Sequence, residues 1–198
     1  IMEVDDGFFA SLSNWDGGFY LGISDGGYPD DVPVYRAFFP LFPLLLALLS
    51  LLPGPLPLLA SMVNIGLYVT AIVLLRRLYP EKDNAVLFFA LLPFAFFHVV
   101  AYTEALALVL ALAYLQSLRN RSLGRAVLLG FLAGLTRITG VALIFFASEP
   151  LRRRDWPAAA AAVAGPAGGM EAWMAYLGAT PGDPLAFLHT MAEFGRAV

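Results

Sequence analysis

Long apolar segments separated by short polar connections dominate this chain after its first 56 residues. The segments run over residues 57–75, 85–101, 105–118, 126–148 and 157–178. Runs such as LLASMVNIGLYVTAIVLL lack the polar face that a helix of a soluble protein keeps toward water. A helix that crosses the hydrocarbon core of a bilayer needs about 20 such residues. The pattern therefore predicts an all-α fold, a polytopic bundle of transmembrane helices.

Basic residues gather in three of the connections, and the positive-inside rule places such connections on the cytoplasmic side. They contain Arg76, Arg77 and Lys82, then Arg119, Arg121 and Arg125, then Arg152, Arg153 and Arg154. Between the second and the third of these connections, the chain must leave the cytoplasmic side of the membrane and return to it. We expect a hairpin of two short limbs broken near residues 136–140, with a single tilted span as the alternative. The hairpin would explain Arg137, because charge and irregular backbone at membrane depth occur where protein or water surrounds them.

The segment 38–57 precedes the first predicted span. Its apolar core between Pro43 and Pro53 has about nine residues, too few to cross a bilayer. We expect an interfacial or re-entrant helix on the outer face. The predicted organisation is an extracytoplasmic loop with this helix (1–56), about six transmembrane helices (57–178) and the start of a second outer loop (179–198). Because the chain begins inside a polar segment, we expect a fragment of a longer protein that lacks at least one N-terminal span.

The composition supports an integral membrane protein, since 60% of the 198 residues are hydrophobic and only 14% are charged. The absence of cysteine excludes disulfides, thiolate metal sites and cysteine nucleophiles. Seven of the fifteen acidic residues lie in the first 31 positions, a segment that includes the stretch WDGGFYLGISDGGY. Nothing in the composition indicates a nucleic-acid partner.

The predicted topology brings several unusual polar residues to the outer side. Some have simple structural explanations: Asp25, Asp30 and Asp31 fit turns, and Asp183 fits a helix cap. His98 in a phenylalanine-rich segment fits packing as well as catalysis. Three residues suggest a site more strongly. They are Asp16 beside two glycines, Glu104 at a helix start, and Arg137 within an apolar segment, where an acid or a phosphate is the expected partner.

The stretch WDGGFYLGISDGGY resembles the WDxxxYxxIAxxGY loop of PIG-V-like mannosyltransferases, which are GT-C membrane glycosyltransferases. Three further stretches support the resemblance in the same order: YRAFFPLFPLL (35–45), FAFFHVVAYTEALALVLALAYL (94–115) and GFLAGLTRITGVAL (130–143). Ser24 departs from the alanine that is usual in the first motif. The resemblance implies a seven-helix module with an extracytoplasmic active site. The family transfers a sugar, commonly mannose, from a polyprenyl-phosphate or dolichyl-phosphate carrier to an acceptor hydroxyl.

The resemblance also implies roles for individual residues. Asp16 would be the general base that deprotonates the acceptor hydroxyl, in a single displacement with inversion. Arg137 would stabilise the departing phosphate, with Arg36 and His98 as weaker candidates. Glu104 and Tyr102 would orient Arg137 or bind the sugar, and Trp15 and Tyr20 would complete the substrate site. Some GT-C enzymes use Mg²⁺ or Mn²⁺, for which Asp16 and Glu104 would be the oxygen ligands.

Two other functions remain open from the residues. A transporter or flippase of lipid-linked sugars would also have broken helices and a charge within the membrane, although we find no internal repeat. A non-catalytic subunit of a glycosylation complex would keep the fold without the chemistry. A bacterial plasma membrane is the expected location, or the endoplasmic reticulum for a eukaryotic source. The sequence does not identify the sugar or the acceptor, which would be a glycan, a lipid or a protein.

Overall fold

The computed structural model of the chain describes residues 14–194, and this part is all-helical without strands. The α-helices within it are α1 (Asp16–Gly26), α2 (Leu41–Leu49), α3 (Leu56–Leu78), α4 (Asp83–Leu91), α5 (Glu104–Arg119), α6 (Leu123–Gly134), α7 (Ser148–Arg152), α8 (Trp156–Ala179) and α9 (Ala186–Phe194). Three 3₁₀ segments join them: η2 (Pro33–Ala37), η3 (Pro93–His98) and η4 (Ile138–Ala147). The predicted all-α class is thus confirmed, whereas the number of membrane spans is not.

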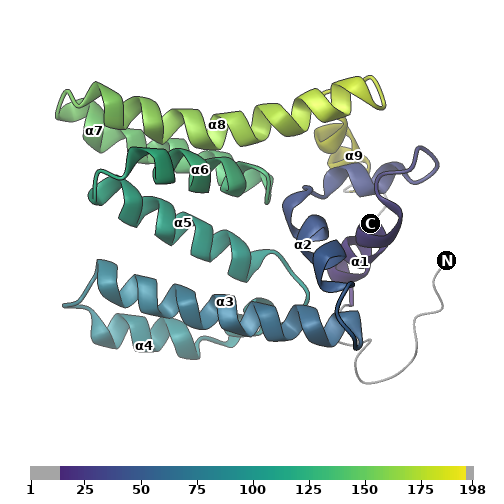
Figure 1. Cartoon of the computed structure of the whole chain (residues 1–198), viewed down its shortest axis with the longest axis horizontal. Coiled ribbons are helices and arrows are strands. Elements are labelled where there is room, and N and C mark those ends of the chain that lie inside the picture. The colour runs from purple at the N-terminus through teal and green to yellow at the C-terminus, as the bar shows by residue number, and fades with distance from the viewer. Residues whose placement is uncertain (1–13, 195–198) are drawn as a thin grey trace.

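The helices form a layered bundle with two different ends (Figure 1). Helix α3 packs on α5, α5 on α6, and α6 on α8. The connections α3–α4, α5–α6 and α7–α8 lie together at one end, and the arginine clusters lie within these connections or in the adjoining turns of the helices. Helices α1, α2 and α9 lie at the opposite end. We call the two ends the arginine end and the α1–α2 end.

Helices α6 and α8 approach closely because each presents a glycine every fourth residue. These are Gly130 and Gly134 on α6, and Gly165 and Gly169 on α8. A Cβ atom built on Gly169 would overlap the carbonyl oxygen of Phe131, so no other residue fits without movement of the backbone. Paired small-xxx-small faces of this kind are typical of helix contacts in membranes.

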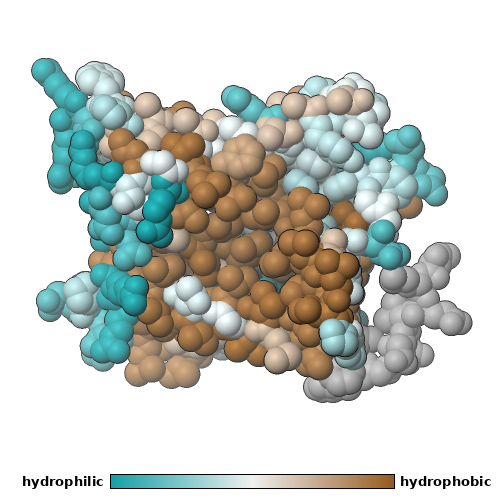
Figure 2. Space-filling model, in the orientation of Figure 1, coloured by the Kyte–Doolittle hydropathy of each residue, from teal (hydrophilic) through white to brown (hydrophobic). Residues whose placement is uncertain are grey.

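Hydrophobic residues cover the middle of the molecular face shown in Figure 2, and hydrophilic residues lie toward its two ends. Many large apolar side chains are exposed, among them Leu44, Leu48, Met62, Ile65, Val69, Leu87, Phe88 and Phe145. Among the described helices, α3 alone is long and apolar enough to cross a membrane by length and composition. Its 23 residues extend about 35 Å at the helical rise per residue.

Some of the predicted spans differ from the helices of the structure. The predicted segment 85–101 is divided, because α4 ends at Leu91 and Pro93 starts the 3₁₀ segment η3. A proline lacks the N–H that a continuous helix would need there. Helix α5 has 16 residues, short for a span. Between Arg125 and Arg152 the chain is interrupted as the hairpin prediction expected, with Arg137 in extended backbone between α6 and η4.

The predicted outer loop 1–56 contains more helix than expected, and its residues 1–13 lie outside the described part of the chain. The WDGGFYLGISDGGY stretch is mainly helix α1, so describing it as a loop was wrong. Asp25 is in the last turn of that helix, not in a turn after it. Helix α2 is the short apolar helix that was expected, although it starts at Leu41 and includes Pro43 in its first turn.

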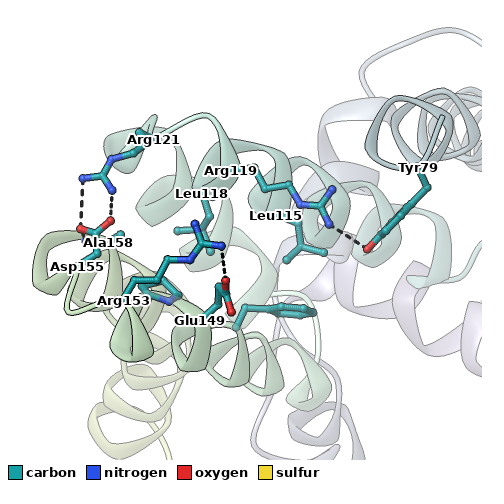
Figure 3. A pocket seen from close by; sticks show the side chains of 11 residues that line it. Tyr79, Leu115, Leu118, Arg119, Arg121, Glu149, Arg153, Asp155 and Ala158 are labelled. Carbon is teal, nitrogen blue, oxygen red and sulfur yellow. Dashed lines mark hydrogen bonds and ion pairs between the residues drawn. The ribbon is translucent and has the colours of Figure 1, made fainter. Parts of the chain in front are cut away.

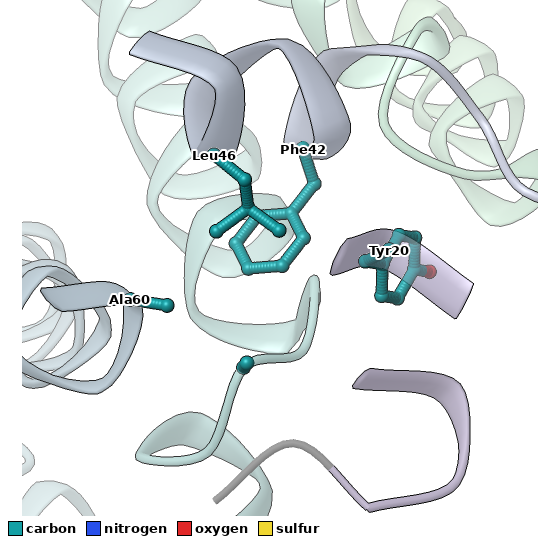
Figure 4. Packing of buried hydrophobic residues seen from close by; sticks show 5 residues of the cluster. Tyr20, Phe42, Leu46 and Ala60 are labelled. Carbon is teal, nitrogen blue, oxygen red and sulfur yellow. The ribbon is translucent and has the colours of Figure 1, made fainter. Parts of the chain in front are cut away.

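A buried hydrophobic cluster attaches α1 and α2 to the bundle. It consists of Tyr20, Phe42, Leu46, Ala60 and Ala101, from α1, α2, α3 and the turn before α5 (Figure 4). The Tyr20 and Phe42 rings meet edge to face at 5.1 Å between centroids, a favoured aromatic geometry. Because Tyr20 lies one helical turn after Asp16, this packing fixes the start of α1 against the turn that leads into α5.

Candidate functional site

Asp16 is the first residue of α1, and the backbone around it is tightly constrained. The preceding Trp15 has φ 55°, a left-handed value that is uncommon for a non-glycine residue. Gly17 donates its N–H to the Asn14 carbonyl at 3.2 Å, and Gly18 donates to Trp15 at 3.1 Å. Strained backbone persists where the surrounding structure holds it, and such strain clusters at functional sites. The Trp15 side chain is 77% exposed beside this turn.

Glu104 and Arg137 form an ion pair between two segments far apart in the sequence. Arg137 Nη1 donates to Glu104 Oε1 at 2.8 Å, which joins the α6–η4 connection to the first residue of α5. The Arg137 side chain is 38% exposed and the Glu104 side chain 29% exposed, so the pair is only partly accessible to solvent. The sequence predicted an acidic or phosphate partner for Arg137, and the structure identifies Glu104.

Asp16 belongs to the same electrostatic group. Although Asp16 retains an exposed surface, the protein around it removes enough water to raise the pKa of its carboxyl. The negative charge of Glu104 raises this pKa further, and the positive charge of Arg137 lowers it. A carboxyl with a raised pKa is a better proton acceptor when it is ionised. Three residues of the predicted site, Asp16, Glu104 and Arg137, are therefore brought together; we call them the acid–arginine group.

Tyr102 connects this group to the turn before α1. Its hydroxyl donates to the Asn14 carbonyl at 3.1 Å, two residues before Asp16. Partial burial raises the pKa of the Tyr102 hydroxyl, so the phenol stays neutral at ordinary pH. Tyr20, also predicted at the site, is buried in the cluster of Figure 4, and burial raises its pKa to about 12. Tyr20 thus supports α1 from within the core, instead of presenting a reactive hydroxyl.

Asn64 of α3 holds the turn that carries Tyr102 and Glu104. Its fully buried side-chain amide donates to the carbonyls of Val100 and Tyr102, the second at 2.9 Å. Among the described residues, its Oδ1 atom has no hydrogen-bond partner. Sequence reasoning missed Asn64, although an asparagine within an apolar run is the kind of signal that could have identified it.

Two predicted site residues lie in other environments. Arg36 on η2 pairs with Asp30 at 2.8 Å, and its charge also acts on Asp183, so the described contacts place it in a separate group. His98 packs against the aromatic ring of Tyr68, with 4.6 Å between ring centroids, on the α3–α4 side of the bundle. The packing role considered for His98 therefore fits the structure better than phosphate binding.

Asp183 begins the segment that leads into α9, as the helix-cap prediction expected. Its Oδ1 accepts the backbone N–H of Leu185 at 3.0 Å, and its Oδ2 lies 2.7 Å from Nδ1 of His189. These two contacts hold the pKa of the Asp183 carboxyl below its usual value. Asp183 and His189 thus stabilise the start of α9.

The side chains offered for a metal do not form a complete ligand set. Among the side chains that the structure describes, no three or more acidic or histidine residues gather where they could hold a metal ion. Glu104, one of the two predicted ligands, is occupied by Arg137. Mg²⁺ is commonly held by one or two carboxylates together with the phosphates of a substrate, so a metal at Asp16 and Glu104 stays a prediction.

Comparisons with known proteins identify no relative from which a function could be transferred. No family model matches the chain, and neither a curated protein nor a solved structure shows significant similarity to it. The resemblance to PIG-V-like mannosyltransferases therefore stays a prediction based on four short stretches of sequence.

Proposed function

We propose that this chain belongs to a polytopic membrane glycosyltransferase that transfers a sugar from a polyprenyl-phosphate carrier to an acceptor hydroxyl. The observation that carries the proposal is the acid–arginine group, in which a partly dehydrated carboxyl from one segment lies within electrostatic range of an ion pair between two others. This combination matches the two needs of the reaction, which are a base for the acceptor and a cation for the phosphate.

The membrane placement has independent support. Hydrophobic residues form the middle of the face in Figure 2, α3 has the length and composition of a span, and α6 packs on α8 through glycines. The arginine clusters lie at one end and the acid–arginine group lies toward the other. With the arginine end on the cytoplasmic side, the acid–arginine group is extracytoplasmic.

The proposed reaction is a single displacement at the anomeric carbon. The acceptor oxygen forms a bond to this carbon while the bond from the carbon to the phosphate oxygen breaks. The phosphate leaves with the electron pair, and the acceptor proton moves to the Asp16 carboxylate. Arg137 stabilises the charge that develops on the phosphate, and Glu104 holds the guanidinium in position. The sugar is mannose if the resemblance holds.

The test compares Asp16→Asn with Asp25→Asn in membranes that contain the protein, using radiolabelled polyprenyl-phosphate sugars as donors. Both residues are on α1 and both changes remove one negative charge, but Asp25 is in the last turn, away from the acid–arginine group. We expect Asp16→Asn to lower transfer by about 100-fold or more, as for loss of a general base, and Asp25→Asn to retain activity at equal expression.

Three outcomes would contradict the proposal in different ways. Transfer that survives Asp16→Asn would move the base elsewhere, with Glu104 as the next residue to replace. Transport of a lipid-linked sugar across vesicle membranes without transfer would favour the transporter. Full activity of a larger complex that contains Asp16→Asn would favour the non-catalytic subunit.

A further inference from the structure

A cavity of about 460 Å³ opens at the arginine end (Figure 3). This end lies across the bundle from α1, the helix that begins with Asp16 (Figure 1). The cavity lies between the end of α5, helix α7 and the start of α8, and Tyr79 after α3 closes one side. Three arginine side chains line it, Arg119, Arg121 and Arg153, together with the carboxylates of Glu149 and Asp155. Nothing in the proposed transfer reaction uses these residues.

Two of the three arginines form ion pairs with acids of the cavity wall. Arg121 forms a two-point ion pair with Asp155, and Arg153 Nη2 lies 2.7 Å from Glu149 Oε1 (Figure 3). Glu149 also accepts from Arg152 at 2.7 Å, so this acid is shared by two cations. The basic residues therefore outnumber the acids around the cavity.

Arg119 has only neutral partners among its described contacts. It donates to the Leu78 carbonyl at 2.9 Å and to the Tyr79 hydroxyl at 3.3 Å, and its guanidinium carbon lies 5.0 Å from the centre of the Tyr79 ring. These contacts fix the guanidinium without compensating its charge, and it retains further N–H donors. A fixed, uncompensated guanidinium with spare donors is suited to a phosphate.

The rest of the cavity wall is apolar. Leu115 and Leu118 of α5 and Phe146 of η4 line it, and Phe146 is 44% exposed. The neighbouring Phe145 does not line the cavity and is 80% exposed, so η4 also presents an apolar side chain on the surface of the bundle. A ligand that fits both parts combines an anionic phosphate with a hydrocarbon chain.

The backbone at this end also shows that arginine stands where glycine is usual. Arg121 and Arg154 have φ 57° and φ 56°. In both cases the hydrogen bonds are those of a Schellman motif, in which the left-handed residue is commonly glycine. An L-residue costs about 1–2 kcal/mol in this conformation. The sequence thus accepts backbone strain while it keeps positive charge beside the cavity.

We propose that this cavity binds the phosphate group of an anionic phospholipid, with an acyl chain lying along the wall formed by Leu115, Leu118 and Phe146. The proposal rests on the membrane placement in the proposed function, but not on the transfer reaction. Basic pockets between membrane helices on the cytoplasmic side are suited to anionic headgroups, and the cytoplasmic leaflet is where the positive-inside rule places the arginine end.

The experiment measures lipid binding by native mass spectrometry of the purified chain in detergent, titrated with phosphatidylglycerol or with phosphatidylcholine. Arg119→Gln removes the uncompensated cation, and Arg125→Gln is the matched control, because Arg125 has the same charge at the same end but does not line the cavity. We expect phosphatidylglycerol to bind in preference to phosphatidylcholine. Arg119→Gln should weaken that binding about fivefold, equivalent to about 1 kcal/mol, and Arg125→Gln should leave it within twofold.

Thermal unfolding of each variant shows whether weaker lipid binding comes from the removed cation or from a destabilised fold. Arg119 also holds Leu78 and Tyr79 in place, so its replacement could disturb the fold. Arg153→Gln is a second test, because the Arg153 side chain is exposed. We expect this variant to weaken phosphatidylglycerol binding as well. Equal binding of the two lipids, or equal losses in Arg119→Gln and Arg125→Gln, would overturn the proposal. Displacement of the lipid by inorganic phosphate alone would overturn the role of the apolar wall.

Flotation with phosphatidylcholine vesicles separates this proposal from the proposed function. A chain that floats with vesicles but shows no preference for phosphatidylglycerol overturns the lipid site alone. A chain that stays in the aqueous phase overturns the membrane placement, and the lipid site fails with it. Loss of sugar transfer in Asp16→Asn bears on the proposed function only.

Discussion

Replacement of Asn64 by alanine should destabilise the fold through the turn that carries Tyr102 and Glu104. The Asn64 amide donates to the carbonyls of Val100 and Tyr102, and all of these groups are buried. The Val100 carbonyl keeps the N–H of Tyr102 as a second donor at 2.7 Å, so most of the cost falls on the Tyr102 carbonyl. A buried polar group that loses its partner costs about 1–3 kcal/mol.

The expected net loss in the free energy of unfolding is about 2 kcal/mol. It combines the lost hydrogen bonds and the small cavity left by truncation, and it is partly offset because the unpartnered Oδ1 of Asn64 is also removed. For a chain of this size, such a loss lowers the unfolding temperature by about 4–8 °C. The assay is thermal unfolding in detergent followed by circular dichroism at the helical band.

Two further variants test whether hydrogen bonding causes the effect. Asn64→Asp keeps the side-chain volume but removes both N–H donors. An ionised aspartate has only acceptors, and a protonated one has a single O–H donor. We expect this variant to destabilise the fold at least as much as alanine does. Ser61→Ala is the matched control, since Ser61 lies one turn earlier on α3, is 4% exposed, and has an Oγ without a partner among the described residues. This control should be neutral or slightly stabilising, and equal unfolding temperatures for Asn64→Ala and Ser61→Ala would refute the reasoning.

Three further outcomes follow from charge, packing and backbone geometry. Glu104→Gln removes a negative charge that raises the pKa of Asp16. The acidic limb of the pH–kcat/KM profile for transfer should therefore move to lower pH. A limb that does not move would contradict the effect of Glu104 on the pKa of Asp16. Gly169→Ala should lower the free energy of unfolding by about 1–3 kcal/mol through overlap with an α6 carbonyl, whereas adjacent Gly168→Ala, with ordinary contacts, should not. Arg154→Gly should raise the unfolding temperature, since glycine removes up to about 1 kcal/mol of left-handed strain.

The long helices could be predicted from the sequence because hydrophobic runs and their boundaries coincide. Residues 57–75 and 157–178 were expected as spans, and the structure has α3 at Leu56–Leu78 and α8 at Trp156–Ala179. The split after α4 was missed because a continuous apolar run masked the signal of Pro93. Helix α1 was missed because its four glycines give it low helix propensity, and packing of Tyr20 against α2 and α3 compensates for that.

The candidate site was predicted in part. Glu104 and Arg137 were visible in the sequence because charges are rare among apolar residues, and Asp16 because two glycines follow it. Their proximity depends on how three segments pack, and a single sequence contains no record of that packing. For the same reason, the partners of Arg36 and Asn64 emerged only from the structure.

The charges of the acid–arginine group limit how a sugar phosphate can bind there. Two carboxylates and one guanidinium leave the group negative when all are ionised, so an anionic donor would be repelled unless its phosphate meets a cation. A proton on Asp16 would reduce the repulsion but would also remove the proposed base. Arg137 resolves this conflict, since its described contact with Glu104 uses Nη1 alone and the rest of its planar fork is available for phosphate. Glu104 would then hold the guanidinium in place, and Asp16 would act as the proposed base in its ionised form. A lysine at position 137 has a point charge and no fork, so the acid and the phosphate would compete for its single ammonium group.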